Sequence, residues 1–355
     1  MRTILYCINL ETGEVIWKTL RPPELHVRDS LYITPSVASS PVVLKDFVVV
    51  SELGAQGKNF AARNILYIDK VNGNLVKSIP AGALDYRAGY SVVVGNEDLL
   101  VSTCGTQKIG ETPPQISPQN RVICVETKTG ETIFDFHIGP IFSEPLICRD
   151  RIYLGTLDGI VFCLKVPDAE RTKLPDKRLI PCEFVLWQFK AEGAVNSNLT
   201  FWDENLYFGS NNGVVYCLDG MTGNVKWKYE VEEKEPRAFK FFSTPTIAEG
   251  RLYIGAANRR LYCFNAKTGQ LIWEYLAEDW IRSRPVCLGS QVYAAALDGT
   301  IYCLSSTDEK VSLSWKIKVG THPILSDLVL ADNKILVNSS DLYLWCISAD
   351  KGRIL

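Results

Sequence analysis

The sequence predicts an all-β fold, a β-propeller built from four-stranded antiparallel blades. One observation behind this prediction is an internal repeat, because a strand reading Leu/Val-Tyr-Cys-Leu recurs along the whole chain. A second is that the apolar runs are short, rich in β-branched and aromatic residues, and bounded by Gly, Asn or Asp. A third is the absence of helical periodicity. Repeats of this kind are typical of propellers.

Each repeat combines the same elements in the same order. An apolar strand that often starts Ser-x-Pro comes first, a strand that ends near Gly follows, and the Tyr-Cys strand is third. A Thr-Gly turn and a strand that carries Trp complete the unit. The third strand occurs eight times, with a mean spacing of about 48 residues, which is close to the length of a four-stranded blade. The eight copies centre on Cys7, Ile68, Cys124, Cys163, Cys217, Cys263, Cys303 and Cys346.

The turn and the Trp strand together resemble the pyrroloquinoline-quinone-like (PQQ-like) repeat family, whose motif reads roughly Ala-x-Asp-x-x-Thr-Gly-x-x-x-Trp. The Asp or Asn position is matched by Asn9, Asp69, Asp219 and Asn265. The turn is matched by Thr12-Gly13, Thr129-Gly130, Thr222-Gly223 and Thr268-Gly269, with Asn72-Gly73 as a variant. The Trp position is matched by Trp17, Trp187, Trp227, Trp273 and Trp315.

The resemblance covers almost the whole chain and implies that each Trp packs between neighbouring blades. Such a Trp contributes roughly 3–5 kcal/mol, judged by the cost of truncating it. The alternative for these Trp and Cys residues is contact with a ligand. Core packing is the interpretation that the repeat favours.

A single propeller domain over residues 1–355 is expected, but its first and last repeats contain different sets of strands. Residues 1–20 supply only the outer hairpin of a first blade, so the count is seven inner strands and eight outer hairpins. One reading is eight blade positions with the first incomplete, its inner strands coming from an upstream segment or a partner by edge addition. The alternative is a seven-bladed ring in which residues 1–20 act as a closing clasp.

Charge and hydropathy exclude some classes of partner. The net charge is −2, which gives no electrostatic reason to expect nucleic acid or an anionic membrane surface. No run approaches the roughly 18 apolar residues that a membrane-spanning helix needs. The first residues enter a strand pattern without the features of a secretory signal.

The eleven cysteines predict free thiols rather than disulfides. Seven of them recur at one register of the third strand, so they fall in separate blades, beyond the roughly 4.4–6.8 Å between Cα atoms that a disulfide requires. No Cys-x-x-Cys occurs, and the three histidines, His26, His137 and His322, are scattered, so no metal site is expected. Abundant free thiols favour the cytoplasm, with an extracytoplasmic location if the chain is a mature form or a fragment.

The sequence lacks the motifs of several well-known catalytic sites. If the resemblance extended to the quinone-dependent dehydrogenases of this superfold, the chain would carry a vicinal Cys pair, a Glu/Asn/Asp calcium set and a catalytic Asp. The chain has no Cys-Cys dipeptide, and no calcium set can be placed in it. It also lacks a nucleophile elbow, a phosphate loop and His-Glu-x-x-His. We therefore expect no catalytic residue and no cofactor, and we disfavour PQQ with calcium.

A binding surface is predicted on the loops that enter the inner strands. These loops share a face with the connections between second and third strands. Two insertions, 54–63 and 105–120, decorate the same face, and long loops on a rigid scaffold are common recognition sites. Cations and aromatics there suit an acidic peptide, an anionic sugar or a metabolite. The alternative is a solvated rim of charges, some paired with Asp85, Glu144 or Asp279. The proposed set is Tyr86, Arg87, Lys240, Trp280, Arg282, Arg284 and His322.

Two functions follow from this sequence. The first is a non-catalytic scaffold or recognition domain that binds a protein partner or an anionic ligand, as part of a larger protein or complex. The second is a quinone- or sugar-related enzyme, or a small-molecule sensor, that uses the channel mouth. A charged insertion, 167–181, is expected on the opposite face as a solvated loop or docking segment.

Overall fold

Short β-strands make up the regular structure of this protein, for which we describe a computed structural model. Thirty strands and no α-helix occur in the part of the chain that the structure describes. No helix long and apolar enough to cross a membrane is found among those residues. The structure describes residues 3–20, 36–37, 41–53, 62–83, 91–95, 99–104, 121–128, 132–139, 141, 143–166, 184–231, 241–307, 310–341 and 343–355.

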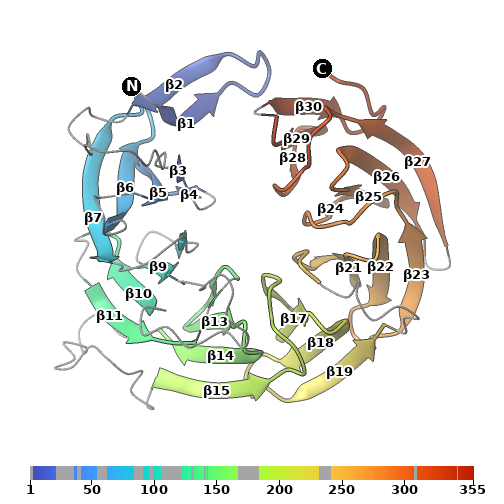
Figure 1. The fold of residues 1–355 in the computed structure, drawn as a ribbon, viewed down its shortest axis with the longest axis horizontal. Helices are drawn as coiled ribbons and strands as arrows, with labels where there is room; N and C mark the ends of the chain where they lie inside the picture. Colours follow the sequence, from blue (N-terminus) through green and yellow to red (C-terminus); the bar gives the residue numbers. More distant parts are fainter. Residues whose placement is uncertain are drawn as a thin grey trace, which may run out of the picture. The chain divides into compact units, whose positions relative to one another are not determined.

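The strands pair in chain order into antiparallel sheets, which Figure 1 shows as successive colour ranges. The N-terminal sheet has the two strands β1 (Thr3–Ile8) and β2 (Val15–Leu20). The next contains β3 (Ser36–Val37), β4 (Val42–Val43), β5 (Phe47–Leu53), β6 (Ala62–Asp69) and β7 (Leu75–Ala83). The third contains β8 (Ser91–Gly95), β9 (Leu99–Cys104), β10 (Arg121–Glu126) and β11 (Thr132–His137).

Four further sheets and then a shorter one follow along the chain. The fourth contains β12 (Leu146–Cys148), β13 (Arg151–Gly155), β14 (Ile160–Lys165) and β15 (Val185–Lys190). The fifth contains β16 (Thr200–Trp202), β17 (Asn205–Gly209), β18 (Val214–Asp219) and β19 (Val225–Glu230). The sixth contains β20 (Thr246–Ala248), β21 (Arg251–Gly255), β22 (Arg260–Asn265) and β23 (Leu271–Leu276). The seventh contains β24 (Val286–Leu288), β25 (Gln291–Ala295), β26 (Thr300–Ser306) and β27 (Val311–Lys318). The last contains β28 (Val329–Ala331), β29 (Lys334–Asn338) and β30 (Leu344–Ser348).

The predicted fold class, all-β with antiparallel blades, is confirmed. All eight predicted copies of the third strand are present, as β1, β6, β10, β14, β18, β22, β26 and β30. Seven of the described sheets have an inner strand, the number that the seven-bladed alternative requires. Residues 1–20 contribute the hairpin β1–β2 as a sheet of its own.

Two compact units divide the chain. One contains residues 1–154 and 164–186, and the other residues 155–163 and 187–355. In the second unit, clusters of aromatic and aliphatic side chains fill the spaces between successive sheets. Strand β17 is buried along its whole length, whereas β19 has one buried side chain, Trp227. The core therefore lies over the middle strands, and each outermost strand shows one face to solvent.

One turn follows the third strand in several repeats, and its geometry explains the Asp or Asn of the motif. The Asp219 carboxylate accepts hydrogen bonds from the amides of Met221 and Thr222, at 3.0 and 2.9 Å. The corresponding oxygens of Asn9, Asp69 and Asn265 accept the equivalent pairs. A short Asp or Asn side chain makes this local turn readily.

The tryptophan of one sheet lies against this turn in the next sheet. The Trp227 indole N–H donates to the carbonyl of Ala266, at 2.9 Å. A Cβ added to Gly269 would lie 2.5 Å from the Trp227 ring, so the turn needs Gly for this close approach as well as for its φ of +72°. Trp17, Trp187 and Trp315 make the same contacts with the turns at Gly73, Gly223 and Gly352. Trp273 instead donates to the Ser306 hydroxyl.

Candidate functional site

The segments that enter the inner strands are held to the turn between the second and third strands of their own sheet. The amide of Leu297 donates to the carbonyl of Trp280, at 2.8 Å. The amides of Asn211 and Ser340 donate in the same way to the carbonyls of Ala194 and Pro323. In these sheets the two kinds of connection therefore lie together at one edge, which we call the entry rim.

Four of the seven predicted ligand-binding residues lie in described parts of the entry rim: Trp280, Arg282, Arg284 and His322. Tyr86, Arg87 and Lys240 lie outside the described residues. Most of the 54–63 insertion, and the whole of the 105–120 and 167–181 insertions, also lie outside them. The predicted binding role of the set remains a prediction.

Trp280 and Arg282 occupy one short segment before β24. Trp280 is 41% exposed, a high value for so large an apolar side chain. Its amide donates to the carboxylate of Asp279, at 2.8 Å. The guanidinium carbon of Arg282 lies 5.4 Å from the ring centre of Phe242, a cation–π arrangement that restrains the Arg side chain. The segment thus presents an exposed indole beside a positioned cation.

Arg284 forms hydrogen bonds to neighbouring sheets through both its side chain and its backbone. The Arg284 Nε donates to the Thr246 hydroxyl of β20, at 3.2 Å, and its amide donates to the carboxylate of Asp327, at 2.7 Å. These bonds connect the inner regions of three successive sheets. His322 is exposed, and its Nδ1 lies 3.1 Å from the Thr321 hydroxyl. Of the four residues, Arg284 has the clearest structural role.

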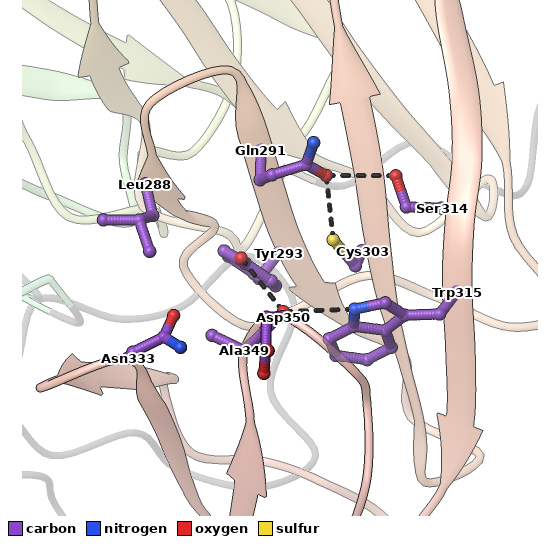
Figure 2. Close-up of a pocket in the computed structure, with 9 residues that line it drawn as sticks. All are labelled: Leu288, Gln291, Tyr293, Cys303, Ser314, Trp315, Asn333, Ala349 and Asp350. Carbon is purple, nitrogen blue, oxygen red and sulfur yellow. Dashed lines mark hydrogen bonds between the residues drawn. The ribbon is translucent and has the colours of Figure 1, made fainter.

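A cavity of about 420 Å³, which the sequence did not predict, lies between the sheet β24–β27 and the sheet β28–β30 (Figure 2). On one side the Gln291 Oε1 accepts hydrogen bonds from the Cys303 thiol and the Ser314 hydroxyl, each at 3.0 Å. On the other side the Tyr293 hydroxyl and the Trp315 indole N–H both donate to the carbonyl of Ala349. Leu288, Asn333 and Asp350 complete the lining.

Most cysteines of the third strands are small buried side chains, whereas Cys7 and Cys346 are partly exposed. Nine cysteines whose side chains the structure describes form no disulfide. Burial raises the pKa of the Cys217 and Cys303 thiols to about 11, and that of the Cys263 thiol to about 12. Such thiols are protonated at neutral pH and poorly nucleophilic. Within the described residues, no group of three or more His, Cys, Asp or Glu side chains forms a possible metal site.

Comparison with known proteins supports the repeat assignment. The family model described as "Outer membrane protein assembly factor BamB" matches residues 183–280. The comparison with curated proteins gave no significant match. The crystal structure of BamB from Moraxella catarrhalis superimposes with a TM-score of 0.64 at 13% identity, covering 94% of this chain and 86% of BamB. The computationally designed Ika8 protein superimposes with a TM-score of 0.65 at 15% identity, covering 90% and 85%. These similarities show that the chain has the fold of a β-propeller and that its residues 183–280 match a repeat model of the PQQ-like kind.

Proposed function

We propose that this β-propeller is a non-catalytic scaffold that recognises a protein partner through its entry rim. The observation that carries the proposal is the exposed Trp280 beside Arg282, on a segment fixed by the Leu297–Trp280 hydrogen bond. Exposed Trp and Arg side chains dominate the binding energy of many protein interfaces. A backbone held in place before binding loses less entropy when a partner docks.

The proposed partner contributes an acidic segment with at least one apolar side chain. Arg282 supplies a cation whose position is set by Phe242, and Trp280 supplies an apolar surface. His322 lies before β28, on the entry rim of the next sheet, and would extend the same surface. The matching family description, an assembly factor for other proteins, supports a role in handling protein partners. The many cysteines that form no disulfide among the described side chains support the predicted reducing compartment.

The test measures binding of a fluorescein-labelled peptide of alternating Glu and Leu by fluorescence anisotropy, with a Lys/Leu peptide as the charge-reversed probe. We expect the acidic peptide to bind and its affinity to fall as salt rises, because ionic screening weakens contacts between exposed charges. The double variant Trp280→Ala/Arg282→Ala should bind at least about tenfold more weakly, as the loss of an interface anchor predicts.

The matched control is Val225→Ala/Lys226→Ala, which removes one exposed apolar side chain and one cation from β19, away from the entry rim. Equal binding by the two double variants would refute the proposed surface. Arg284 is left unchanged, because its hydrogen bonds to neighbouring sheets would confuse binding with folding. A calcium requirement or a visible chromophore in the purified protein would favour the enzyme or sensor instead.

A further inference from the structure

The cavity beside Tyr293 occupies a place that the preceding sheet fills with its own arginine. Strand pairing aligns the repeats, because Tyr293 pairs with Cys303 as Tyr253 pairs with Cys263. Two residues before the tyrosine, Gln291 corresponds to Arg251. The two spaces between sheets can therefore be compared position by position.

The preceding space lies between the sheet β20–β23 and the sheet β24–β27, and there the Arg251 guanidinium is mostly buried. Its side chain is 14% exposed, and one of its terminal nitrogens lies 3.9 Å from the Glu249 carboxylate. Arg251 also hydrogen-bonds the Tyr253 hydroxyl, which partly offsets the burial that raises the pKa of Tyr253. Ile272, on the strand that carries Trp273, packs into the same cluster. An arginine and an isoleucine thus fill the space between these sheets.

Both filling side chains are replaced around the cavity. Ser314 stands where the preceding sheet has Ile272, and Gln291 stands where it has Arg251. The Gln291 amide oxygen is used by Cys303 and Ser314 on one side of the cavity (Figure 2). The volume that remains, about 420 Å³, lies within the roughly 300–1,000 Å³ typical of small-ligand sites.

The walls of the cavity suit a planar cation. Asp350 places a carboxylate in the lining where the corresponding residue of the preceding space is Thr307. The Ser348 hydroxyl hydrogen-bonds that carboxylate and holds its pKa below the usual range, so it is ionised at neutral pH. Lys351 competes for this carboxylate, with its Nζ 3.9 Å from Asp350 Oδ2. Trp315 and Tyr293 supply aromatic walls, which favour a flat guanidinium.

We propose that this cavity binds a guanidinium group, supplied by an arginine side chain of a partner or by a small guanidinium compound. The bound group takes the place that Arg251 fills in the preceding space, with Asp350 in the role of Glu249. This site lies apart from the entry rim, since the turns that line it join first to second strands or follow the third strand. It is therefore independent of the proposed acidic-peptide surface.

The test compares N-acetyl-L-arginine amide with its neutral isostere N-acetyl-L-citrulline amide and with N-acetyl-L-lysine amide. Saturation-transfer NMR and calorimetry on the whole chain measure binding. We expect arginine to bind at least about fivefold more tightly than either analogue, because a planar cation pairs with the carboxylate and the rings together. A second arm uses the peptide Gly-Gly-Arg-Gly-Gly. Tighter binding of this peptide than of the free amide identifies a protein as the source of the guanidinium, and weaker binding identifies a small molecule.

Two variants and a control locate the site. Gln291→Arg supplies the cavity with the chain's own guanidinium, as in the preceding repeat, and should abolish binding of the arginine probe without loss of folding. Asp350→Asn should weaken binding about fivefold, the effect of losing a partly exposed ion pair. Asp203→Asn, the same change at an exposed position on another sheet, should have no effect.

Three results would overturn the proposal. They are equal binding of citrulline and arginine, no saturation transfer to arginine at millimolar concentration, and arginine binding that survives Gln291→Arg. Lys351→Gln gives a further check, because removing the competing cation should strengthen arginine binding. A decrease in affinity for that variant would contradict the assigned role of Asp350.

Discussion

The outer hairpins β1–β2 and β18–β19 share a sequence pattern and a turn but differ in their surroundings. Each contains Tyr-Cys on its first strand, a turn with Gly at positive φ, and a Trp on its second strand. Tyr216 of β18 is 1% exposed, whereas Tyr6 of β1 is 54% exposed. One face of β1–β2 is thus open to solvent, while both faces of β18 are buried.

This difference distinguishes turn formation, which depends on the repeat alone, from burial of the tyrosine, which depends on neighbouring elements. The turn forms in both hairpins, because its hydrogen bonds join residues at most five positions apart. Burial of the tyrosine requires another element packed on its face. In β18 that burial comes with an aromatic stack between Tyr216 and Phe208, whose ring centres are 5.0 Å apart. Local sequence specifies the hairpin, and neighbouring sheets supply most of its stability.

The largest expected effect comes from removing the two tyrosines. Tyr216→Ala should lower the free energy of unfolding by about 3–5 kcal/mol, because it removes a buried ring. Tyr6→Ala should change it by less than about 0.5 kcal/mol, as expected for an exposed side chain. Urea denaturation followed by circular dichroism measures both. A loss at Tyr6 as large as at Tyr216 would mean that another element covers that face in solution.

The turn glycines give a second matched pair. Gly223 has a φ of +75°, and an added Cβ would lie 2.7 Å from the Trp187 ring. Gly13 has a φ of +73°, with nothing among the described residues within 4 Å of that position. Gly13→Ala should cost about 1 kcal/mol from backbone strain, and Gly223→Ala about 2–3 kcal/mol, since the indole must also move. Equal costs in thermal denaturation would contradict the role given to the indole.

The Asp219 carboxylate and the Asn9 amide should contribute equally to the free energy of unfolding, because the hydrogen bonds that each accepts from the turn are local. Asp219→Ala and Asn9→Ala should each cost about 1 kcal/mol, the usual value for such side-chain hydrogen bonds to backbone amides. Chemical denaturation of the two variants checks this equality. A markedly larger loss for one of them would show that its turn depends on its surroundings.

The smallest effect is a pH dependence confined to the turn that contains Asp219. Burial raises the pKa of Asp219, but hydrogen bonds from Thr222, Met221 and Lys226 outweigh this and hold the pKa below its usual value. The stabilisation is therefore present above the pKa of an unfolded Asp and is lost as pH falls through the lower pKa of the folded state. Asp219→Asn keeps the turn, as Asn9 and Asn265 do, and should reduce the loss of stability between neutral pH and pH 3. An unchanged pH profile would refute this assignment.

The sequence predicted the third strands and their turns because both depend on residues that recur. The inner strands are short and harder to place from sequence, as in the eighth copy, where β28 covers only Val329–Ala331. The Ser326 hydroxyl bonds to both the carbonyl and the amide of Asn338, so this side chain does the pairing that a backbone would do in a longer strand. The same exchange occurs between Ser197 and Gly209 and between Ser283 and Ala295, so the recurring Ser marks this contact but does not mark the residue at which the inner strand begins.

The candidate sites were predicted in part. Cations and aromatics marked the entry rim, but the sequence did not separate Arg284, bonded to neighbouring sheets, from Arg282, which lies over Phe242. The cavity was missed because it results from the smaller side chains of Gln291 and Ser314 on two different strands. Comparing the position two residues before each pairing tyrosine, where Arg151, Asn205, Arg251 and Gln291 stand, would have indicated it.

The contact that Trp17, Trp187, Trp227 and Trp315 make with the turn of the following sheet has a direction. One sheet supplies the indole, and the next supplies the carbonyl and the glycine that receive it. A duplicated repeat inserted between two others therefore carries an indole for its successor and a receiving turn for its predecessor. Proteins in which successive sheets share this contact can gain or lose whole repeats during evolution without sequence changes in the neighbouring sheets.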